Sequence, residues 1–326
     1  MKKIVPVFVI TLGLLLPGCS TLKSTNSSNQ SSIEDSFSNI TSVSSVESQP
    51  SSEDNFIFSE QDISFTNSDN SVIAKIPNYT PTSTSRVTTT SVQEYTVDYA
   101  ELTNTITTST LRAVITIDVT CYNTSRFGMV TNYVEYTGSG VIVKEDERGY
   151  FAITNNHVIV KEAGYNYAKY SVNDYVGNSH RAQYVASDPN YDLGVIYFEK
   201  GSVRLNVIEN IRTGQLAEGE PVISLGQPKG QLNSITYGKV NGYPEATELS
   251  NAEAYQSNVS FNILEHSAKI ASGSSGGPVL DTNLNIVGIN YAGSTVDETG
   301  FSTVCAAIPG EKVAEYWNSV KSTYSL

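Results

Sequence analysis

Short stretches of alternating apolar and polar residues recur from about residue 110 onward, and turn-forming residues separate them. Alternation with a period of two is typical of a β-strand with one buried face, and repeated short strands indicate an all-β barrel or sandwich. We expect one such domain over residues 97–326, with a short leading helix over residues 99–111 and an amphipathic helix over residues 311–320. The expected strands are residues 113–122, 133–143, 150–154, 181–186, 193–199, 222–225, 279–280 and 286–291.

A serine set among glycines is the first candidate for chemistry. Residues 273–278 read GSSGGP, a tight turn that carries Ser275. A serine hydroxyl becomes a nucleophile when an imidazole accepts its proton and a carboxylate holds that imidazole in the right tautomer. Gly273 allows its own N–H group and that of Ser275 to face one point, as an oxyanion hole requires. Ser274 is a rival hydroxyl, and a flexible turn without chemistry is the alternative interpretation of so short a motif.

The chain has only three histidines, and one of them ends a strand. His157 follows the β-prone residues 150–154, where the chain turns polar and leaves the core. A histidine at such a place is rigid yet open to a substrate. His180 lies in a polar stretch that is typical of a solvated turn, and His266 precedes the serine motif and is expected to be structural or near the cleft. His157 is therefore the best candidate for the base.

Two aspartates stand near the start of the apolar strand over residues 193–199. Asp192 begins that strand and is expected to point inward, where a carboxylate persists only if it is paired and hydrogen-bonded. Asp188 precedes a proline and is better explained as a turn residue in solvent. Asp192 is therefore the candidate that orients the imidazole.

The order His157, Asp192, Ser275 is that of chymotrypsin, and here the chain resembles a known family. It is similar to the trypsin-like serine proteases, and more narrowly to the bacterial HtrA/Deg branch. The resemblance implies two six-stranded antiparallel β-barrels (chymotrypsin-like) with the catalytic triad in the cleft between them. It also implies that His157 is the general base, Asp192 its orienting group and Ser275 the nucleophile. Gly273 and Ser275 would form the oxyanion hole. The matching segments are 138–142 (GSGVI), 150–158 (YFAITNNHV), 187–195 (SDPNYDLGV), 223–228 (ISLGQP), 271–280 (ASGSSGGPVL), 286–290 (IVGIN) and 306–309 (AAIP).

Two features depart from that branch. Ser274 stands before the nucleophile, where the HtrA branch usually has Asn and trypsins usually have Asp. HtrA proteins normally continue into PDZ domains, and the residues after Pro309 are too few for such a domain. We therefore expect a protease domain that lacks a PDZ domain.

The primary specificity pocket of this fold is walled by the segment before the nucleophile and by a strand after it. Here these are Lys269, Ile270, Asn290, Tyr291 and Ala292. No carboxylate stands six residues before Ser275, so a basic substrate side chain would be desolvated without a partner. Small aliphatic residues are the favoured substrates by the resemblance. An acidic preference is the alternative if Lys269 reaches the pocket floor, although a lysine more often extends to water.

The N-terminus resembles a bacterial lipoprotein signal. A basic start precedes an apolar run over residues 4–16 that is too short for a permanent membrane helix. Cys19 follows this run after Pro17 and Gly18, which predicts a signal peptide over residues 1–18 and lipidation of Cys19. An ordinary secretory signal is the alternative. Two acyl chains anchor a protein stably, so we expect the protein at the outer face of the cytoplasmic membrane.

The stretch that follows is rich in Ser, Thr and Asn. Residues 19–96 cannot bury enough apolar surface to offset the ordering entropy, so a disordered tether is expected. The net charge of −13 includes no strongly basic segment, which argues against nucleic acid as a partner. Cys121 and Cys305 sit in expected strands of different barrels, and the sequence does not decide whether they pair. No cofactor is expected, and no metal-ligand spacing is found among the histidines and cysteines.

Together these features predict a membrane-tethered, extracytoplasmic serine endopeptidase that hydrolyses unfolded or surface proteins. A catalytically silent lipoprotein that uses the same scaffold for binding or holdase activity is the alternative, and a missing triad member would indicate it. A glutamyl endopeptidase is less favoured, because Asn290 stands where that group is expected to have a histidine. The oligomeric state is not indicated.

Overall fold

The structure is a computed structural model that describes residues 23–26, 57–58, 72–73, 95–246 and 257–326. The predicted signal peptide over residues 1–18 lies outside the described residues, and so does most of the predicted tether over residues 19–96. The described chain is continuous from Tyr95 up to residue 246.

Six antiparallel strands close into a first barrel. The sheet order is β6-β5-β8-β9-β10-β7, and a further pairing of β6 with β7 closes it. The alternation in β5 explains its burial, because Ile115, Ile117, Val119 and Cys121 all fall on the face that lines the core. The strands are β5 (Val114–Thr124), β6 (Val130–Glu145), β7 (Gly149–Thr154), β8 (Tyr167–Asn173), β9 (Ser179–Asp188) and β10 (Leu193–Glu199).

A second barrel follows in the chain and is built in the same way. Its order is β11-β14-β15-β16-β13-β12, and β11 pairs with β12 to close it. The predicted all-β fold of two six-stranded antiparallel barrels is confirmed. The strands are β11 (Pro221–Gly226), β12 (Ser234–Gly242), β13 (Leu264–His266), β14 (Pro278–Leu280), β15 (Ile286–Val296) and β16 (Ser302–Pro309).

Four short strands lie before the first barrel in the chain. β1 (Lys23–Asn26) pairs with β6, and β2 (Ile57–Phe58) pairs in parallel with β12. β3 (Val72–Ile73) and β4 (Thr96–Val97) pair with each other.

The first helix, α1 (Tyr99–Thr108), begins where the carboxylate of Asp98 accepts hydrogen bonds from the N–H groups of Ala100 and Glu101. The prediction had extended it to residue 111. It ends earlier because the Thr108 hydroxyl bonds back to the carbonyl of Asn104 and the chain tightens into a 3₁₀ turn, η1 (Thr110–Ala113).

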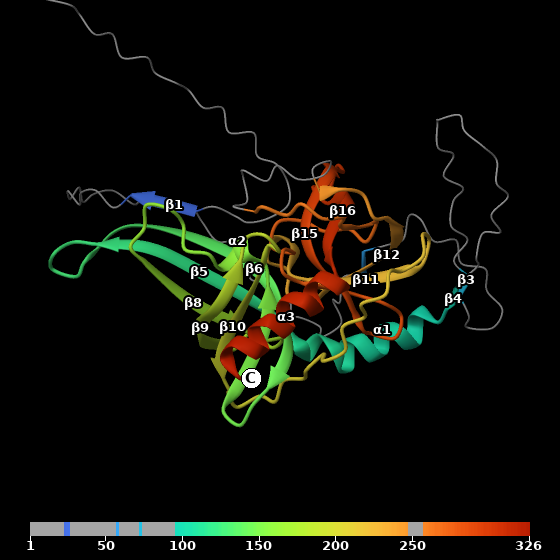
Figure 1. The fold of residues 1–326 in the computed structure, drawn as a ribbon, viewed down its shortest axis with the longest axis horizontal. Helices are drawn as coiled ribbons and strands as arrows, with labels where there is room; N and C mark the ends of the chain where they lie inside the picture. Colours follow the sequence, from blue (N-terminus) through green and yellow to red (C-terminus); the bar gives the residue numbers. More distant parts are fainter. Residues whose placement is uncertain (1–22, 27–56, 59–71, 74–94, 247–256) are drawn as a thin grey trace, which may run out of the picture.

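The predicted C-terminal helix is confirmed and is longer than expected. It is α3 (Gly310–Tyr324), and it buries Val313, Tyr316, Trp317 and Val320 on one face. The helix leaves the second barrel and runs toward β9 and β10 of the first (Figure 1). The Tyr324 hydroxyl donates a hydrogen bond of 2.9 Å to the carbonyl of Val185 on β9. The helix therefore links the two barrels.

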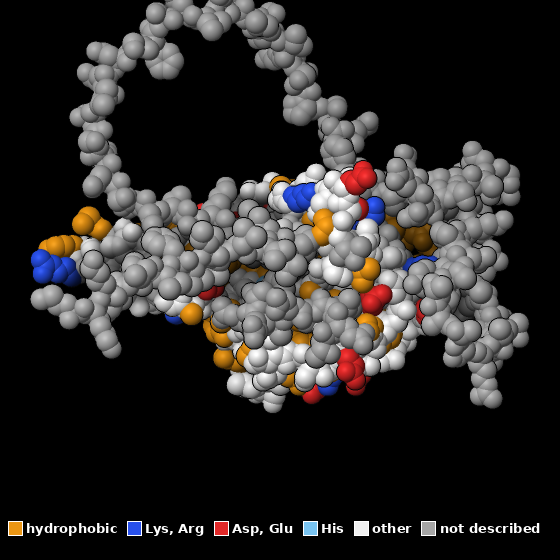
Figure 2. Space-filling model, turned by 90° about the horizontal axis from the view of Figure 1, so that it is seen from above, with side chains coloured by type: hydrophobic (Ala, Val, Ile, Leu, Met, Phe, Trp, Pro, Cys, Tyr) orange, Lys and Arg blue, Asp and Glu red, His pale blue; other side chains and the backbone are white. Residues whose placement is uncertain are grey.

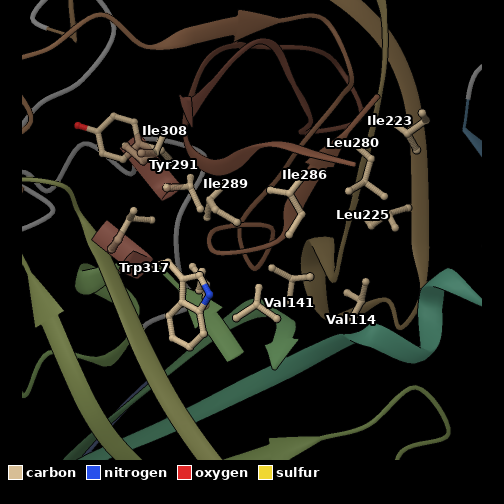
Figure 3. Packing of buried hydrophobic residues seen from close by; sticks show 14 of the residues in the cluster. Val114, Val141, Ile223, Leu225, Leu280, Ile286, Ile289, Tyr291, Ile308 and Trp317 are labelled. Atoms are coloured by element: carbon tan, nitrogen blue, oxygen red, sulfur yellow. The ribbon is translucent and has the colours of Figure 1, made fainter. Parts of the chain in front are cut away.

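The two barrels share one apolar cluster at their boundary. Val114 and Val141 come from the first barrel, and Ile286 and Ile289 come from the second. Figure 3 shows these side chains gathered in one region together with Trp317 of α3. Burial of this cluster holds the barrels in a fixed relation, so the boundary between them is a rigid place for a site.

Both described cysteines are buried free thiols, Cys121 on β5 and Cys305 on β16. They therefore lie in different barrels, without a disulfide. In Figure 2 the described part of one face carries charged side chains of both signs in small groups. Within the described residues, no helix has the length and apolar character needed to cross a membrane.

Candidate active site

His157 lies where the first barrel meets the second. It belongs to the short helical turn α2 (Asn156–Ile159), which directly follows β7. Its side chain is only 5% exposed, and its Nδ1 lies 2.7 Å from Oδ2 of Asp192. Its backbone N–H donates to Oδ1 of the same carboxylate at 2.9 Å. Both oxygens of Asp192 therefore hold one residue, which fixes the plane and position of the imidazole.

Asp192 is fully buried at the start of β10. Its backbone adopts a left-handed conformation with φ of 48°, which a residue with a side chain adopts only when its surroundings hold it there. The Asn155 side-chain amide donates to the Asp192 carbonyl at 2.9 Å. Burial raises the pKa of the Asp192 carboxyl above its ordinary value, and the charge and hydrogen bonds of His157 oppose that rise.

Asp188 has a different environment. Its carboxylate accepts a hydrogen bond of 2.8 Å from the N–H of Asn190 in an exposed turn. This is the turn geometry expected for an aspartate before a proline. Of the two aspartates considered from the sequence, only Asp192 contacts His157.

The Ser275 loop of the second barrel packs against the first barrel through positions that only glycine fits. Gly276 has φ of 85°, and an added Cβ would lie 2.2 Å from the Ser139 carbonyl oxygen and from Oγ1 of Thr154. The Ser275 carbonyl accepts a hydrogen bond of 2.7 Å from the N–H of Ser139 on β6. Ser139 follows Gly138, where an added Cβ would contact both the Val158 side chain and the Ser275 carbonyl oxygen. Ser275 is therefore held beside the turn that carries His157.

The rival hydroxyl of Ser274 has a local role. Its Oγ accepts a hydrogen bond of 3.2 Å from the N–H of Ala271, while its own N–H donates to the Ala271 carbonyl at 2.9 Å. The residue is 2% exposed. The Ser274 side chain thus closes the turn that precedes Ser275.

The sequence did not single out Ser139 on its own, yet it holds the oxyanion segment. Its hydroxyl donates to the Gly273 carbonyl at 2.7 Å and accepts from the Gln227 N–H at 3.0 Å. The Ser272 carbonyl accepts from the N–H of Lys229 at 2.6 Å. The carbonyl groups on both sides of the Gly273 N–H are therefore held in place. The one available signal was the serine between glycines at residues 138–140.

The expected pocket residues do not all face the same way. Ile270 is buried and lies near Gly293 of β15. A Cβ added to Gly293 would lie 3.4 Å from Cδ1 of Ile270 and 2.4 Å from Oγ of Ser302. The sequence analysis did not select Gly293 or Ser302. The available signal was Gly293, because a glycine inside a strand often marks a close approach of a ligand or of another chain segment. The side chain of Asn290 donates to Oγ of Ser224 at 2.8 Å inside the second barrel.

The remaining expected pocket residues lie in two different environments. Tyr291 and Ala292 are buried in the shared apolar cluster. Lys269 is 41% exposed and pairs with Asp297 at 3.2 Å, so its charge meets a carboxylate on the β15–β16 turn. The side chain of Lys269 is therefore accounted for by this turn.

Residues 138–289 match the family model for the trypsin-like peptidase domain. This part of the chain is similar to trypsin-like peptidase domains. The matched segment begins in β6, ends in β15 and contains His157, Asp192 and Ser275.

The chain is similar to curated bacterial serine proteases and shares its fold with a solved protease structure. The chain is 35% identical over 177 residues to the serine protease Do-like HtrB of Bacillus subtilis, covering 54% of this chain and 36% of that protein. It is 31% identical over 155 residues to the periplasmic serine endoprotease DegP of Escherichia coli, covering 48% of this chain and 30% of that protein. The match thus spans about a third of each relative. The solved HtrA-type protease AlgW with decapeptide shares the fold, with a TM-score of 0.52 at 23% identity over 68% of this chain and 67% of that one.

The two other histidines of the matched segment lie away from His157 and have other surroundings. His180 is the second residue of β9 rather than part of a turn, and its Nε2 lies 3.1 Å from the buried carboxylate of Asp174. That carboxylate also accepts hydrogen bonds from the N–H groups of Val176 and Asn178, so it organises the β8–β9 turn. His266 is fully buried in the second barrel, and burial lowers its pKa to about 4.

Proposed function

We propose that the chain is a serine endopeptidase in which His157 is the general base, Asp192 orients it and Ser275 is the nucleophile. The observation that carries the proposal is the double contact of the Asp192 carboxylate with His157, at 2.7 Å to Nδ1 and 2.9 Å to the backbone N–H. A carboxylate at Nδ1 favours the tautomer in which Nε2 accepts a proton. The relatives named above are serine proteases, which supports the same reaction.

The reaction follows from this arrangement. The Ser275 oxygen attacks the carbonyl carbon of the scissile peptide while Nε2 of His157 takes the hydroxyl proton. His157 then gives that proton to the leaving amine as the peptide C–N bond breaks. Water repeats the two steps on the acyl-enzyme and frees Ser275. The N–H groups of Gly273 and Ser275 would stabilise the oxyanion in each tetrahedral intermediate.

Substrates are proposed to be unfolded or surface polypeptides cut after small aliphatic residues. The contact of Ile270 with Gly293 and Ser302 supports a small, mostly apolar pocket. The pairing of Lys269 with Asp297 supports this proposal over an acidic preference, because the ammonium already has a carboxylate partner.

The domain organisation and location are also proposals. A signal peptide over residues 1–18, a lipid anchor at Cys19 and a tether over residues 19–96 would place the peptidase domain outside the cytoplasm, at the membrane surface. The periplasmic description of the DegP relative supports an extracytoplasmic site. Wild-type protein should partition into detergent and the Cys19→Ala variant should not. Wild-type protein free in the medium with an N-terminus at Ser20 or later would contradict the anchor.

A fluorophosphonate probe tests the catalytic proposal directly. The probe should label the folded protein once, and peptide mapping should find the label on Ser275. The same preparation should hydrolyse denatured casein, and both properties should be lost in Ser275→Ala. A folded protein that is neither labelled nor active would favour the binding or holdase alternative.

A further inference from the structure

Lys229 contacts both the oxyanion segment and the β15–β16 turn. It lies in the turn that follows β11, within the 3₁₀ turn η2 (Pro228–Gly230). Its backbone N–H donates to the Ser272 carbonyl at 2.6 Å. Its ammonium donates to the Thr299 carbonyl on the β15–β16 turn and lies 4.9 Å from the centre of the Phe301 ring.

The backbone contact decides which way the Gly273 N–H points. The C=O of Ser272 and the N–H of Gly273 belong to one planar trans peptide, so they point in opposite directions. Because Lys229 holds the Ser272 carbonyl, the Gly273 N–H faces away from Lys229. A rotation of this peptide would turn the carbonyl, instead of the N–H, toward the developing oxyanion.

The ammonium contact ties Lys229 to the β15–β16 turn. The β15–β16 turn is closed by the Asp297 carboxylate, which accepts hydrogen bonds from the N–H groups of Thr299 and Phe301. The same carboxylate pairs with Lys269, beside Ile270. Lys229 thus has a firm acceptor at the far end of its side chain.

The backbone of Lys229 shows that its position is imposed. It has φ of 55°, in the left-handed region that a lysine adopts at a cost. Such a conformation persists where surrounding contacts hold it, and it gathers at functional sites. Gly300 leaves the room for the ammonium, because an added Cβ there would lie 2.7 Å from Nζ of Lys229.

We propose that Lys229 is a positioning residue that holds the Ser272–Gly273 peptide in the orientation needed for the oxyanion hole, with its ammonium anchored on the β15–β16 turn. The inference rests on the proposed function. Lys229 touches no substrate in this role. It acts on the transition state through the Gly273 N–H, so it should affect kcat more than KM.

The test compares Lys229→Met, which keeps most of the length of the side chain and removes the ammonium, with Lys229→Arg, which restores a cation. Removal of an oxyanion donor typically lowers kcat by about 10²–10³, and loosening one should cost less, about tenfold. We expect Lys229→Met to lower kcat on a peptide substrate about tenfold, with KM within about twofold of wild type and the Tm unchanged. The rate of fluorophosphonate labelling should fall in parallel, and Lys229→Arg should recover most of both losses.

Lys321→Met is the matched control. Its ammonium also lies over an aromatic ring, 5.7 Å from the centre of the Trp317 ring, but on α3. It should behave as wild type. An unchanged kcat in Lys229→Met, a change confined to KM, or an Arg variant as slow as the Met variant would each overturn the role of Lys229. Wild-type protein that is neither labelled nor active would instead overturn the proposed function.

Discussion

The hydroxyl of Ser139 on the first barrel donates a hydrogen bond of 2.7 Å to the carbonyl of Gly273 on the second. The same hydroxyl oxygen accepts a hydrogen bond of 3.0 Å from the Gln227 N–H, and the Ser139 backbone N–H donates one of 2.7 Å to the Ser275 carbonyl. One fully buried serine therefore fastens three residues of the second barrel, in two segments, to β6. The site between the barrels depends on this contact as well as on the three candidate catalytic residues.

Ser139→Ala should weaken both stability and activity. It leaves the Gly273 carbonyl and the Gln227 N–H without this partner in a buried place, and an unsatisfied buried group costs about 1–3 kcal/mol. Denaturant unfolding should show a loss of that order, and kcat should fall more than KM. Ser187→Ala is the control, because its hydroxyl is hydrogen-bonded to the Tyr184 hydroxyl at 3.0 Å in an exposed region. Equal stability of the Ser139 and Ser187 variants would show that the Ser139 hydroxyl is dispensable.

Alanine substitutions of Ser274 and Ser275 should differ sharply in their effect on hydrolysis. Ser275→Ala removes the proposed nucleophile and should lower casein hydrolysis by several orders of magnitude while the fold is kept. Ser274→Ala loses only the hydrogen bond that closes the turn to Ala271, so we expect it to retain activity within about tenfold of wild type. Hydrolysis rates and circular dichroism of both variants decide the assignment. An inactive Ser274→Ala beside an active Ser275→Ala would reverse it.

Asp192→Asn should cost far more than Asp188→Asn. The amide of asparagine would hold the wrong imidazole tautomer, an effect of roughly 10⁴ in kcat in a chymotrypsin-type triad. Asp188 contacts an exposed turn and not His157, so its change to asparagine should leave kcat near the wild-type value. Steady-state kinetics on one peptide substrate give both numbers. Similar losses in the two variants would show that Asp192 does not orient His157.

His266 should make the protein less stable as the pH falls from 6.5 to 4. The folded chain keeps this histidine neutral because burial lowers its pKa to about 4, whereas the unfolded chain protonates it near 6.5. Unfolding therefore takes up a proton in this window, and the free energy of unfolding decreases by up to roughly 3 kcal/mol. His266→Leu removes that dependence. Denaturant unfolding of both proteins at pH 7 and pH 4.5 should show the smaller acid loss in the variant, and equal acid losses would contradict the prediction.

The cut sites in denatured casein should follow small aliphatic residues, and Lys269→Met should leave that preference unchanged. The reason is that Lys269 pairs with Asp297 on the β15–β16 turn. Ile270→Ala, by contrast, removes side-chain volume beside Gly293 and Ser302 and should shift cleavage toward larger apolar residues. Mass spectrometry of the fragments gives the distribution. A wild-type majority after Glu or Asp that disappears in Lys269→Met would place the lysine in the pocket, and a majority after Arg or Lys would contradict both readings.

Strands with strong apolar alternation were predictable, and weakly patterned strands were not. β10 was expected over the range that the structure shows, because its residues are nearly all buried. β8 was not among the expected strands, since only Val172 of its seven residues is buried and its pattern is correspondingly faint. β12 and β13 were also not expected. β13 is only three residues long, and β12 carries a glycine at 238 beside Thr236 and Lys239. Such strands form because neighbouring strands pair with them. The local sequence pattern does not indicate that pairing.

The sequence by itself was enough to choose His157, Asp192 and Ser275, because each stands in a local motif: a strand end, a strand start and a glycine-rich turn. It also indicated two barrels through the resemblance of those motifs in their order. The tertiary structure alone decided that Ser274 closes a turn and that Lys269 meets Asp297. It alone joined Ser139 to Gly273, which lie 134 positions apart. The physical reason is that hydrogen bonds and ion pairs between distant positions depend on how the barrels pack, and that packing comes from the buried apolar cluster they share.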